Sequence, residues 1–237
     1  MNTYVVGHRG ASDLVAENTI GSFLRALELG VNELELDLRA TSDGQVVVIH
    51  DATVDRTTNG TGAVGELTLE QIQALDAGDG ARVPTFAEVL EATTGWLQVE
   101  IKDSKAIDPM MAVLRDHPKE VARLAPTSFD TENVARLATL LPDVCVGLIS
   151  KESSVEVLDR AAELGARRVL VGIAGVDPEF VQTAHDRGFR VDVWPIDTPD
   201  QVRRAVELGA DGFTTDDPRI VTEAGFRMTA DGLVPTT

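Results

Sequence analysis

Short apolar runs alternate with helix-like segments along most of the chain. The segment Ala161–Ala166 (AAELGA) is repeated as Ala205–Ala210 (AVELGA), and similar segments occupy residues 26–31 and, more weakly, 184–189. In each copy a glycine stands just after a helix end, where a left-handed conformation is favoured. An apolar run follows each copy, and in the second half the copies lie a little over twenty residues apart. This alternation predicts parallel strands joined by helical crossovers.

The pattern predicts nine strands and eight helices. The expected strands are Thr3–Gly7, Glu33–Leu38, Val46–Ile49, Leu97–Ile101, Arg123–Ala125, Val144–Ile149, Arg168–Gly172, Arg190–Trp194 and Gly212–Thr214. The expected helices are Thr19–Leu29, Leu69–Leu75, Thr85–Thr93, Ile107–Arg115, Thr131–Leu140, Ser154–Leu164, Pro178–Arg187 and Pro199–Leu208. Thr85 with Glu88 predicts a capping box, and Pro178 and Pro199 stand just inside helix starts.

Nine strands are one more than a closed eight-stranded barrel needs. The segments 46–49 and 123–125 are the candidates for the extra strand. The turn signal at residues 41–44 (TSDG) leaves no helix between the second and third strands. Residues 52–82 are rich in glycine and threonine and predict a small insertion over one rim. We therefore expect an irregular α/β barrel, a single domain over residues 1–237.

The charge of the chain restricts its partners. The 237 residues carry a formal net charge of −18, which argues against nucleic acid and anionic membrane surfaces as partners. An anionic substrate would then need a local positive site, which His8, Arg9, Lys102 and a bound cation could supply. No apolar run is long enough to span a bilayer, and the N-terminus shows no signal-peptide pattern. The single cysteine, Cys145, lies between valines and is expected to be buried, so we expect a cytoplasmic protein without disulfides.

Carboxylates alternate with apolar residues in two predicted strands. Glu35 and Asp37 share one face of a strand whose leucines face the other way, and Glu100 occupies a similar place in a later strand. A solvated edge strand would show the same alternation, but the flanking leucines favour the barrel interior. Buried unpaired carboxylates are costly, and a divalent cation offsets that cost. Three carboxylates give an all-oxygen site, which suits Mg²⁺ or Ca²⁺ rather than zinc.

Two of the four histidines, His8 and His50, directly follow β-like runs. A histidine near neutrality can give or take a proton, although a lone histidine is more often structural. Arg9 and Lys102 are salt-bridge partners of the acids or ligands of a phosphate. Trp194 either packs at the rim or forms a wall of a substrate pocket. The remaining histidines, His117 and His185, are expected at the surface.

Taken together, these segments resemble the glycerophosphodiester phosphodiesterase family over nearly the whole chain. The matching segments are His8-Arg9-Gly10-Ala11-Ser12, Glu17-Asn18-Thr19, Glu35-Leu36-Asp37, His50-Asp51, Arg56-Thr57-Thr58-Asn59-Gly60, Pro84-Thr85-Phe86, Glu100-Ile101-Lys102, Ser128-Phe129, Trp194 and Gly209-Ala210-Asp211-Gly212 with Thr215-Asp216. Two places depart from the family pattern. Ala16 replaces a proline before Glu-Asn-Thr, and Pro195-Ile196-Asp197 follows the tryptophan where Thr-Val-Asn is common.

The resemblance implies a distorted (β/α)₈ TIM barrel with a small insertion. It implies that Glu35, Asp37 and Glu100 hold a divalent cation and that His8 and His50 are the acid/base pair. It further implies that Arg9 contacts the phosphate, with Lys102 nearby.

The expected reaction is cleavage of a small glycerophosphodiester to glycerol 3-phosphate and an alcohol. A lysophospholipase D-like enzyme and a non-catalytic barrel that binds a phosphorylated ligand are the alternatives. The polar insertion favours small deacylated substrates, and the acid/base pair argues against pure binding. The head group, the metal, the roles of the two histidines and the oligomeric state stay open.

Overall fold

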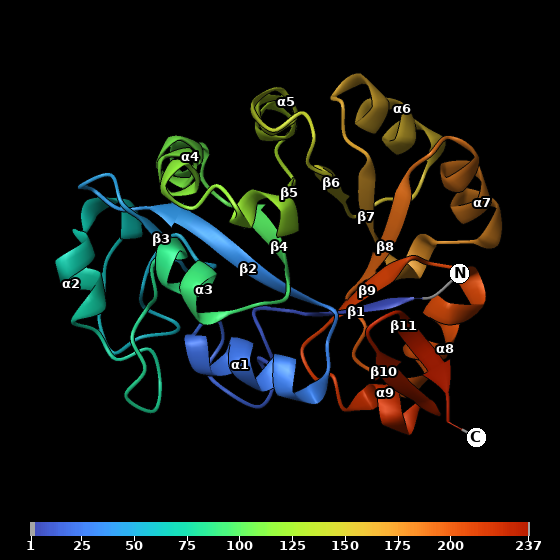
Figure 1. Cartoon of the computed structure of the whole chain (residues 1–237), viewed down its shortest axis with the longest axis horizontal. Coiled ribbons are helices and arrows are strands. Elements are labelled where there is room, and N and C mark those ends of the chain that lie inside the picture. Colours follow the sequence, from blue (N-terminus) through green and yellow to red (C-terminus); the bar gives the residue numbers. More distant parts are fainter. Residues whose placement is uncertain (1–2, 237) are drawn as a thin grey trace.

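The computed structural model describes residues 3–236 and shows a closed barrel (Figure 1). Its eight parallel strands are β1 (Tyr4–Gly7), β2 (Glu33–Ala40), β4 (Trp96–Ile101), β5 (Leu124–Ser128), β6 (Gly147–Ser150), β7 (Arg168–Gly172), β8 (Arg190–Trp194) and β9 (Gly212–Thr215). The first strand, β1, pairs with both β9 and β2, and these pairings close the ring. The predicted (β/α)₈ TIM barrel is therefore confirmed.

The distortion comes from β3 (Val46–Val48), which pairs antiparallel with β2 at the barrel edge. As predicted, no helix separates these two strands. Of the two candidates for the extra strand, the segment at 46–48 is the addition. The segment around residue 125 is a true barrel strand, longer than expected, and continues through Pro126.

Seven helices lie outside the barrel between its strands (Figure 1). They are α1 (Ile20–Leu29), α3 (Phe86–Ala92), α4 (Ile107–Asp116), α5 (Thr131–Leu140), α6 (Val155–Glu163), α7 (Pro178–Asp186) and α8 (Pro199–Leu208). The four glycines of the repeated segments all have positive φ, from 75° to 92°, as the C-terminal pattern predicted. The expected capping box at Thr85 is present, and a second one begins α8 at Thr198. Each helix buries a row of apolar side chains against the strands.

The insertion at residues 52–82 packs beside β3 around a small apolar cluster of its own. It contains a short 3₁₀ turn (Val64–Glu66) and the helix α2 (Leu69–Gln73). Val54 and Ile72 are fully buried in this cluster, so the insertion has a fixed conformation rather than that of an open loop.

After β9 the chain forms α9 (Ile220–Glu223) and an antiparallel hairpin of β10 (Phe226–Thr229) and β11 (Gly232–Pro235), which the sequence pattern did not predict. Backbone and side-chain hydrogen bonds join the hairpin to the start of β1 and β2: Leu233 N donates to Thr3 O at 2.9 Å, and Asn32 Nδ2 donates to Thr229 O at 2.8 Å. The hairpin therefore lies at the amino-terminal end of the barrel.

Charged side chains fill the interior at that same end. The Arg168 guanidinium is fully buried, donates to Glu33 and Asp192 at 2.6 and 2.7 Å, and donates to Gln98 Oε1 at 2.9 Å. Arg190 adds contacts of 3.1–3.2 Å to the same two carboxylates. This cluster closes the bottom of the barrel, so the carboxyl ends of the strands are left for chemistry.

The burial of Cys145 and of two histidines differs from the sequence expectation. The Cys145 side chain is half-buried rather than fully buried. His185 was expected at the surface, but its side chain is only 15% exposed and hydrogen-bonds to Asp211 at 2.8 Å. His117 is likewise half-buried.

Within residues 3–236, no helix combines the length and apolar character that a membrane crossing requires.

Candidate active site

Three carboxylates meet at the carboxyl end of the barrel. Asp37 on β2 is in register with Glu100 on β4, and Glu35 lies one pleat below on the same inner face. Ligand oxygens of the three residues lie within 4.8 Å of one another, and all three residues are buried. Glu35 Oε1 and Asp37 Oδ1 are buried and accept no hydrogen bond, and of the two only Asp37 Oδ1 lies within ion-pair distance of Lys102. An all-oxygen cluster with buried atoms that accept no hydrogen bond fits a hard divalent cation.

The electrostatics of this cluster also favour a cation. Burial and the neighbouring Asp37 raise the pKa of Glu35 to about 8. Burial and Asp37 raise the pKa of Glu100 as well. Burial acts in the same direction on Asp37, but the cations of Lys102 and Arg9 outweigh it and lower the pKa of this carboxyl. Like charges this close resist ionisation together, and a bound cation would relieve that resistance.

Lys102 extends the cluster on one side. Its Nζ atom lies 2.6 Å from Glu100 Oε1 and 3.3 Å from Asp37 Oδ1. The residue follows β4 directly, so the strand end places its ammonium group at the mouth of the barrel.

A tight turn after β1 brings Arg9 to the other side. Arg9 has a left-handed φ of 53°, unusual for a residue with a long side chain, and Gly10 follows with φ of 91°. A Cβ atom on Gly10 would lie 2.4 Å from Ser22 Oγ, so this position accepts only glycine. The turn directs the Arg9 backbone N–H onto Glu35 Oε2 at 2.9 Å and places its Nε 3.4 Å from Asp37 Oδ2.

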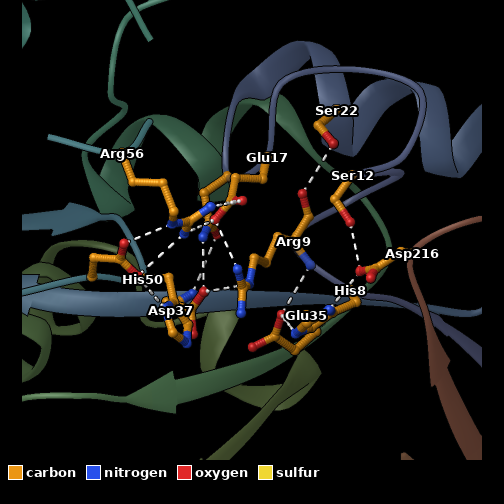
Figure 2. A network of polar contacts seen from close by, with 12 residues as sticks. His8, Arg9, Ser12, Glu17, Ser22, Glu35, Asp37, His50, Arg56 and Asp216 are labelled. Carbon is orange, nitrogen blue, oxygen red and sulfur yellow. Dashed lines mark hydrogen bonds and ion pairs between the residues drawn. The ribbon is translucent and has the colours of Figure 1, made fainter. Parts of the chain in front are cut away.

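His8 precedes this turn and is held by a carboxylate (Figure 2). Its Nδ1 lies 2.6 Å from Asp216 Oδ1, which also accepts a hydrogen bond from Ser12 Oγ at 2.7 Å. His8 Nε2 is therefore the free nitrogen, and it lies 4.0 Å from Glu35 Oε2. Burial lowers the pKa of His8, but Asp216 and Glu35 outweigh it, so this pKa is raised overall.

His50 is held in the same way by a different carboxylate. Its Nδ1 lies 2.6 Å from Asp51 Oδ1, and its backbone carbonyl accepts a hydrogen bond from Arg39 Nε at 2.7 Å. Burial lowers the pKa of His50, and the neighbouring acids offset this only in part. The two imidazoles therefore share one geometry but have pKa values shifted in opposite directions.

A cavity of about 420 Å³ unites the predicted residues. Seven of the eight line it, namely His8, Arg9, Glu35, His50, Glu100, Lys102 and Trp194. The eighth, Asp37, is fully buried and lies in the same carboxylate cluster. A larger cavity of about 820 Å³ between α1, α3 and the insertion contains none of these residues. The candidate site residues therefore gather at the smaller cavity.

Comparison with known proteins agrees with this geometry. Residues 8–220 match the model of the glycerophosphoryl diester phosphodiesterase family. The chain belongs to this family. It is 36% identical over 233 residues to a glycerophosphodiester phosphodiesterase of Caldanaerobacter subterraneus, an alignment that covers 92% of this chain and 96% of the relative.

Solved structures of glycerophosphodiester phosphodiesterases share the fold. A glycerophosphodiester phosphodiesterase from Agrobacterium tumefaciens superposes with a TM-score of 0.81 at 28% identity and covers 92% of this chain and 98% of its own. A phosphodiesterase from Oleispira antarctica, solved in complex with the product sn-glycerol-3-phosphate, gives a TM-score of 0.88 at 24% identity, with coverage of 94% and 96%.

In this member of the family, one wall of the cavity is apolar. Phe129, Ile149, Leu170, Trp194 and Pro195 line it. The Phe129 and Trp194 rings meet edge to face, with their centroids 5.6 Å apart. Of the two places that the sequence left open for Trp194, the structure puts the residue at the lining of the cavity, and its buried Nε1 has no acceptor among the described residues.

The sequence reasoning gave no role to the carboxylates that hold the histidines. Asp51 directly follows His50, whereas Asp216 directly follows β9, at a strand end like those that carried the other candidates. Active-site residues of such barrels lie at the carboxyl ends of the strands, so the end of β9 was a signal for Asp216.

Proposed function

We propose that this chain is a metal-dependent glycerophosphodiester phosphodiesterase that produces glycerol 3-phosphate and an alcohol. The observation that carries the proposal is one cavity lined by two imidazoles, each with Nδ1 fixed by an aspartate, beside a cluster of three carboxylates. Family membership supports the same reaction, since the relatives named above are phosphodiesterases.

The donor set supports Mg²⁺ or Ca²⁺ as the cofactor, held by Glu35, Asp37 and Glu100. Such an ion would supply positive charge to the phosphoryl oxygens in the transition state. Arg9 and Lys102 lie beside the same carboxylates and would bind the remaining phosphate oxygens. A diester phosphate would thereby find a positive site in a chain that is strongly acidic overall.

The two histidines would move the protons. With Nδ1 hydrogen-bonded to aspartate, each ring has Nε2 left for proton transfer, and both histidines line the cavity. The lowered pKa of His50 favours it as the base that takes the proton from the attacking hydroxyl. The raised pKa of His8 favours it as the acid that protonates the departing alkoxide oxygen. Overall, the P–O bond to the alcohol breaks and the oxygen of one water forms the new P–O bond. The proton that His50 takes up is matched by the proton that His8 gives to the alkoxide.

The decisive experiment measures release of glycerol 3-phosphate from glycerophosphocholine by the full chain, with Mg²⁺, with Ca²⁺ and after chelation. We expect turnover with at least one ion and none after chelation. His8→Ala and His50→Ala should each lower turnover by about 10²–10⁴-fold, the usual contribution of a general acid or base. Wild-type rates in both variants would contradict the assignment. Turnover of lysophosphatidylcholine but not of glycerophosphocholine would instead favour a lysophospholipase D-like activity.

A further inference from the structure

Arg56 belongs to the insertion and does not line the catalytic cavity, yet it makes four hydrogen bonds to two carboxylates. Its side chain is 48% exposed. An exposed arginine usually gains little from an ion pair and is free to move. Two bidentate forks on one guanidinium instead define a fixed geometry. Figure 2 shows Arg56 directed at the group of residues that contains Arg9 and His50.

The first fork leads to Arg9. Arg56 Nη1 and Nη2 donate to the two oxygens of Glu17 at 2.6 and 2.9 Å. Glu17 Oε1 also accepts a hydrogen bond from Arg9 Nη1 at 2.9 Å. Burial raises the pKa of Glu17, but the two arginines outweigh it and keep this carboxyl ionised. One carboxylate thus joins the insertion to the side chain that would bind phosphate.

The second fork leads to His50. Arg56 Nε and Nη2 donate to the two oxygens of Asp51 at 2.6 and 3.2 Å. Asp51 Oδ1 in turn lies 2.6 Å from His50 Nδ1. The orientation of the His50 imidazole therefore depends on the Asp51 carboxylate, which Arg56 fixes through two hydrogen bonds.

The insertion keeps Arg56 in place through its backbone. Val54, two residues before, is fully buried in the apolar cluster of the insertion. Its N–H donates to Gly62 O at 3.0 Å, and its carbonyl accepts from Thr58 N at 3.1 Å. Arg56 therefore lies in a turn that is closed by backbone hydrogen bonds, and this turn holds the arginine rigidly.

We propose that Arg56 is a positioning residue that sets Arg9 through Glu17 and His50 through Asp51 at the same time. The insertion would then contribute to catalysis, because its packing fixes the distance between the Arg9 guanidinium, which would bind phosphate, and the His50 imidazole, which would transfer a proton. This inference rests on the proposed phosphodiesterase function. A displacement of about 1 Å in a reacting group can lower the rate by about 10²-fold, so loss of a distant support is measurable.

The test compares Arg56→Met, Arg56→Lys and the control Arg82→Met, each in the full chain with glycerophosphocholine and the activating metal ion. Arg82 lies in the same insertion and pairs with Glu88 on α3, away from the cavity. We expect Arg56→Met to lower kcat by about 10–100-fold and to raise KM several-fold, and we expect Arg82→Met to change neither. Arg56→Lys should restore only part of the rate, since an ammonium group is a point charge without a planar fork.

Two further variants separate positioning from a general loss of structure. Asp51→Asn should lower mainly kcat and Glu17→Gln should raise mainly KM, whereas Arg56→Met changes both. Adding Arg56→Met to Asp51→Asn should lower kcat little further, since both changes release the same imidazole.

Kinetic constants for Arg56→Met equal to those of Arg82→Met would overturn the positioning role of Arg56, as would full recovery in Arg56→Lys or additive losses in the double variant. An inactive wild-type chain would instead overturn the proposed function itself.

Discussion

The buried guanidinium of Arg168 offers a quantitative test of how the barrel is held together. Replacing it with methionine keeps much of the side-chain volume but removes five hydrogen bonds to Glu33, Asp192 and Gln98. Both carboxylates are at least 95% buried and would lose their main cation. Removing one partner of a buried ion pair typically costs about 3–5 kcal/mol of unfolding free energy.

The structure places the expected loss at the lower end of that range. Arg190 stays 3.1–3.2 Å from the same two carboxylates and retains part of the compensation. We therefore expect Arg168→Met to lower the free energy of unfolding by about 3 kcal/mol. For a chain of this size such a loss lowers the melting temperature by about 6–12 °C. Urea unfolding at pH 7 measures the first quantity and a thermal scan the second.

The stability difference between the wild type and Arg168→Met should depend on pH. In the wild type, burial opposes ionisation of Asp192, but Arg168 and Arg190 outweigh it and lower the pKa of this carboxyl in the folded state. Asp192 therefore stabilises the fold above its unfolded pKa of about 3.9, and this contribution is lost as the pH falls through the lower folded value. In the variant, the buried Asp192 carboxyl loses its main cation and gains from taking up a proton, so the difference between the two chains should shrink from pH 7 to pH 4.

A matched control is available on the surface. Arg25 pairs with Glu28 on the exposed side of α1, and Arg25→Met should cost no more than about 1 kcal/mol. A loss below 1 kcal/mol for Arg168→Met, or a difference from the wild type that does not change with pH, would refute the reasoning.

Three other outcomes follow from the structure. Asp216→Asn should lower kcat by up to about 10²-fold, because it weakens the fixed orientation and the charge of His8; steady-state rates at several pH values measure this. Mg²⁺ or Ca²⁺ at about 100 times its dissociation constant should raise the free energy of unfolding by about 2.7 kcal/mol, an effect seen in thermal scans and much reduced in Glu100→Gln. Thr85→Ala should cost about 1 kcal/mol in urea unfolding through loss of the α3 cap and leave the rate constants unchanged, and loss of activity there would contradict the assignment of the site.

Local sequence signals predicted most of the fold and the positions of the site residues. The alternation of leucine and acid at residues 34–38 is a two-residue period, and the structure places Glu35 and Asp37 on the inner face of β2. Glycines after helices and threonine or proline at helix starts act within a few residues, so the helix ends could be inferred without tertiary information.

Other features depend on distant contacts that a sequence pattern does not encode. The predicted strand at 123–125 stops just before Pro126, yet β5 continues through this proline and its neighbours pair in register with β4 and β6, so the barrel accommodates the missing donor. Arg168 opens an apolar run like any strand start, and its acidic partners lie on β2 and β8. Nothing local distinguishes such a residue from a surface cation. The hairpin at residues 226–235, by contrast, carries a local signal that the prediction missed: Phe226–Thr229 alternates apolar and polar residues, and Asp231-Gly232 marks a tight turn.

The closure of the barrel has a consequence for how activity arises during folding. His8 at the end of β1 is oriented by Asp216, 208 residues later and just beyond β9. β9 docks between β8 and β1, so this imidazole gains its partner only when the last strand completes the ring. Recovery of turnover during refolding should therefore coincide with ring closure, and hydrolysis would serve as a reporter for the final docking event.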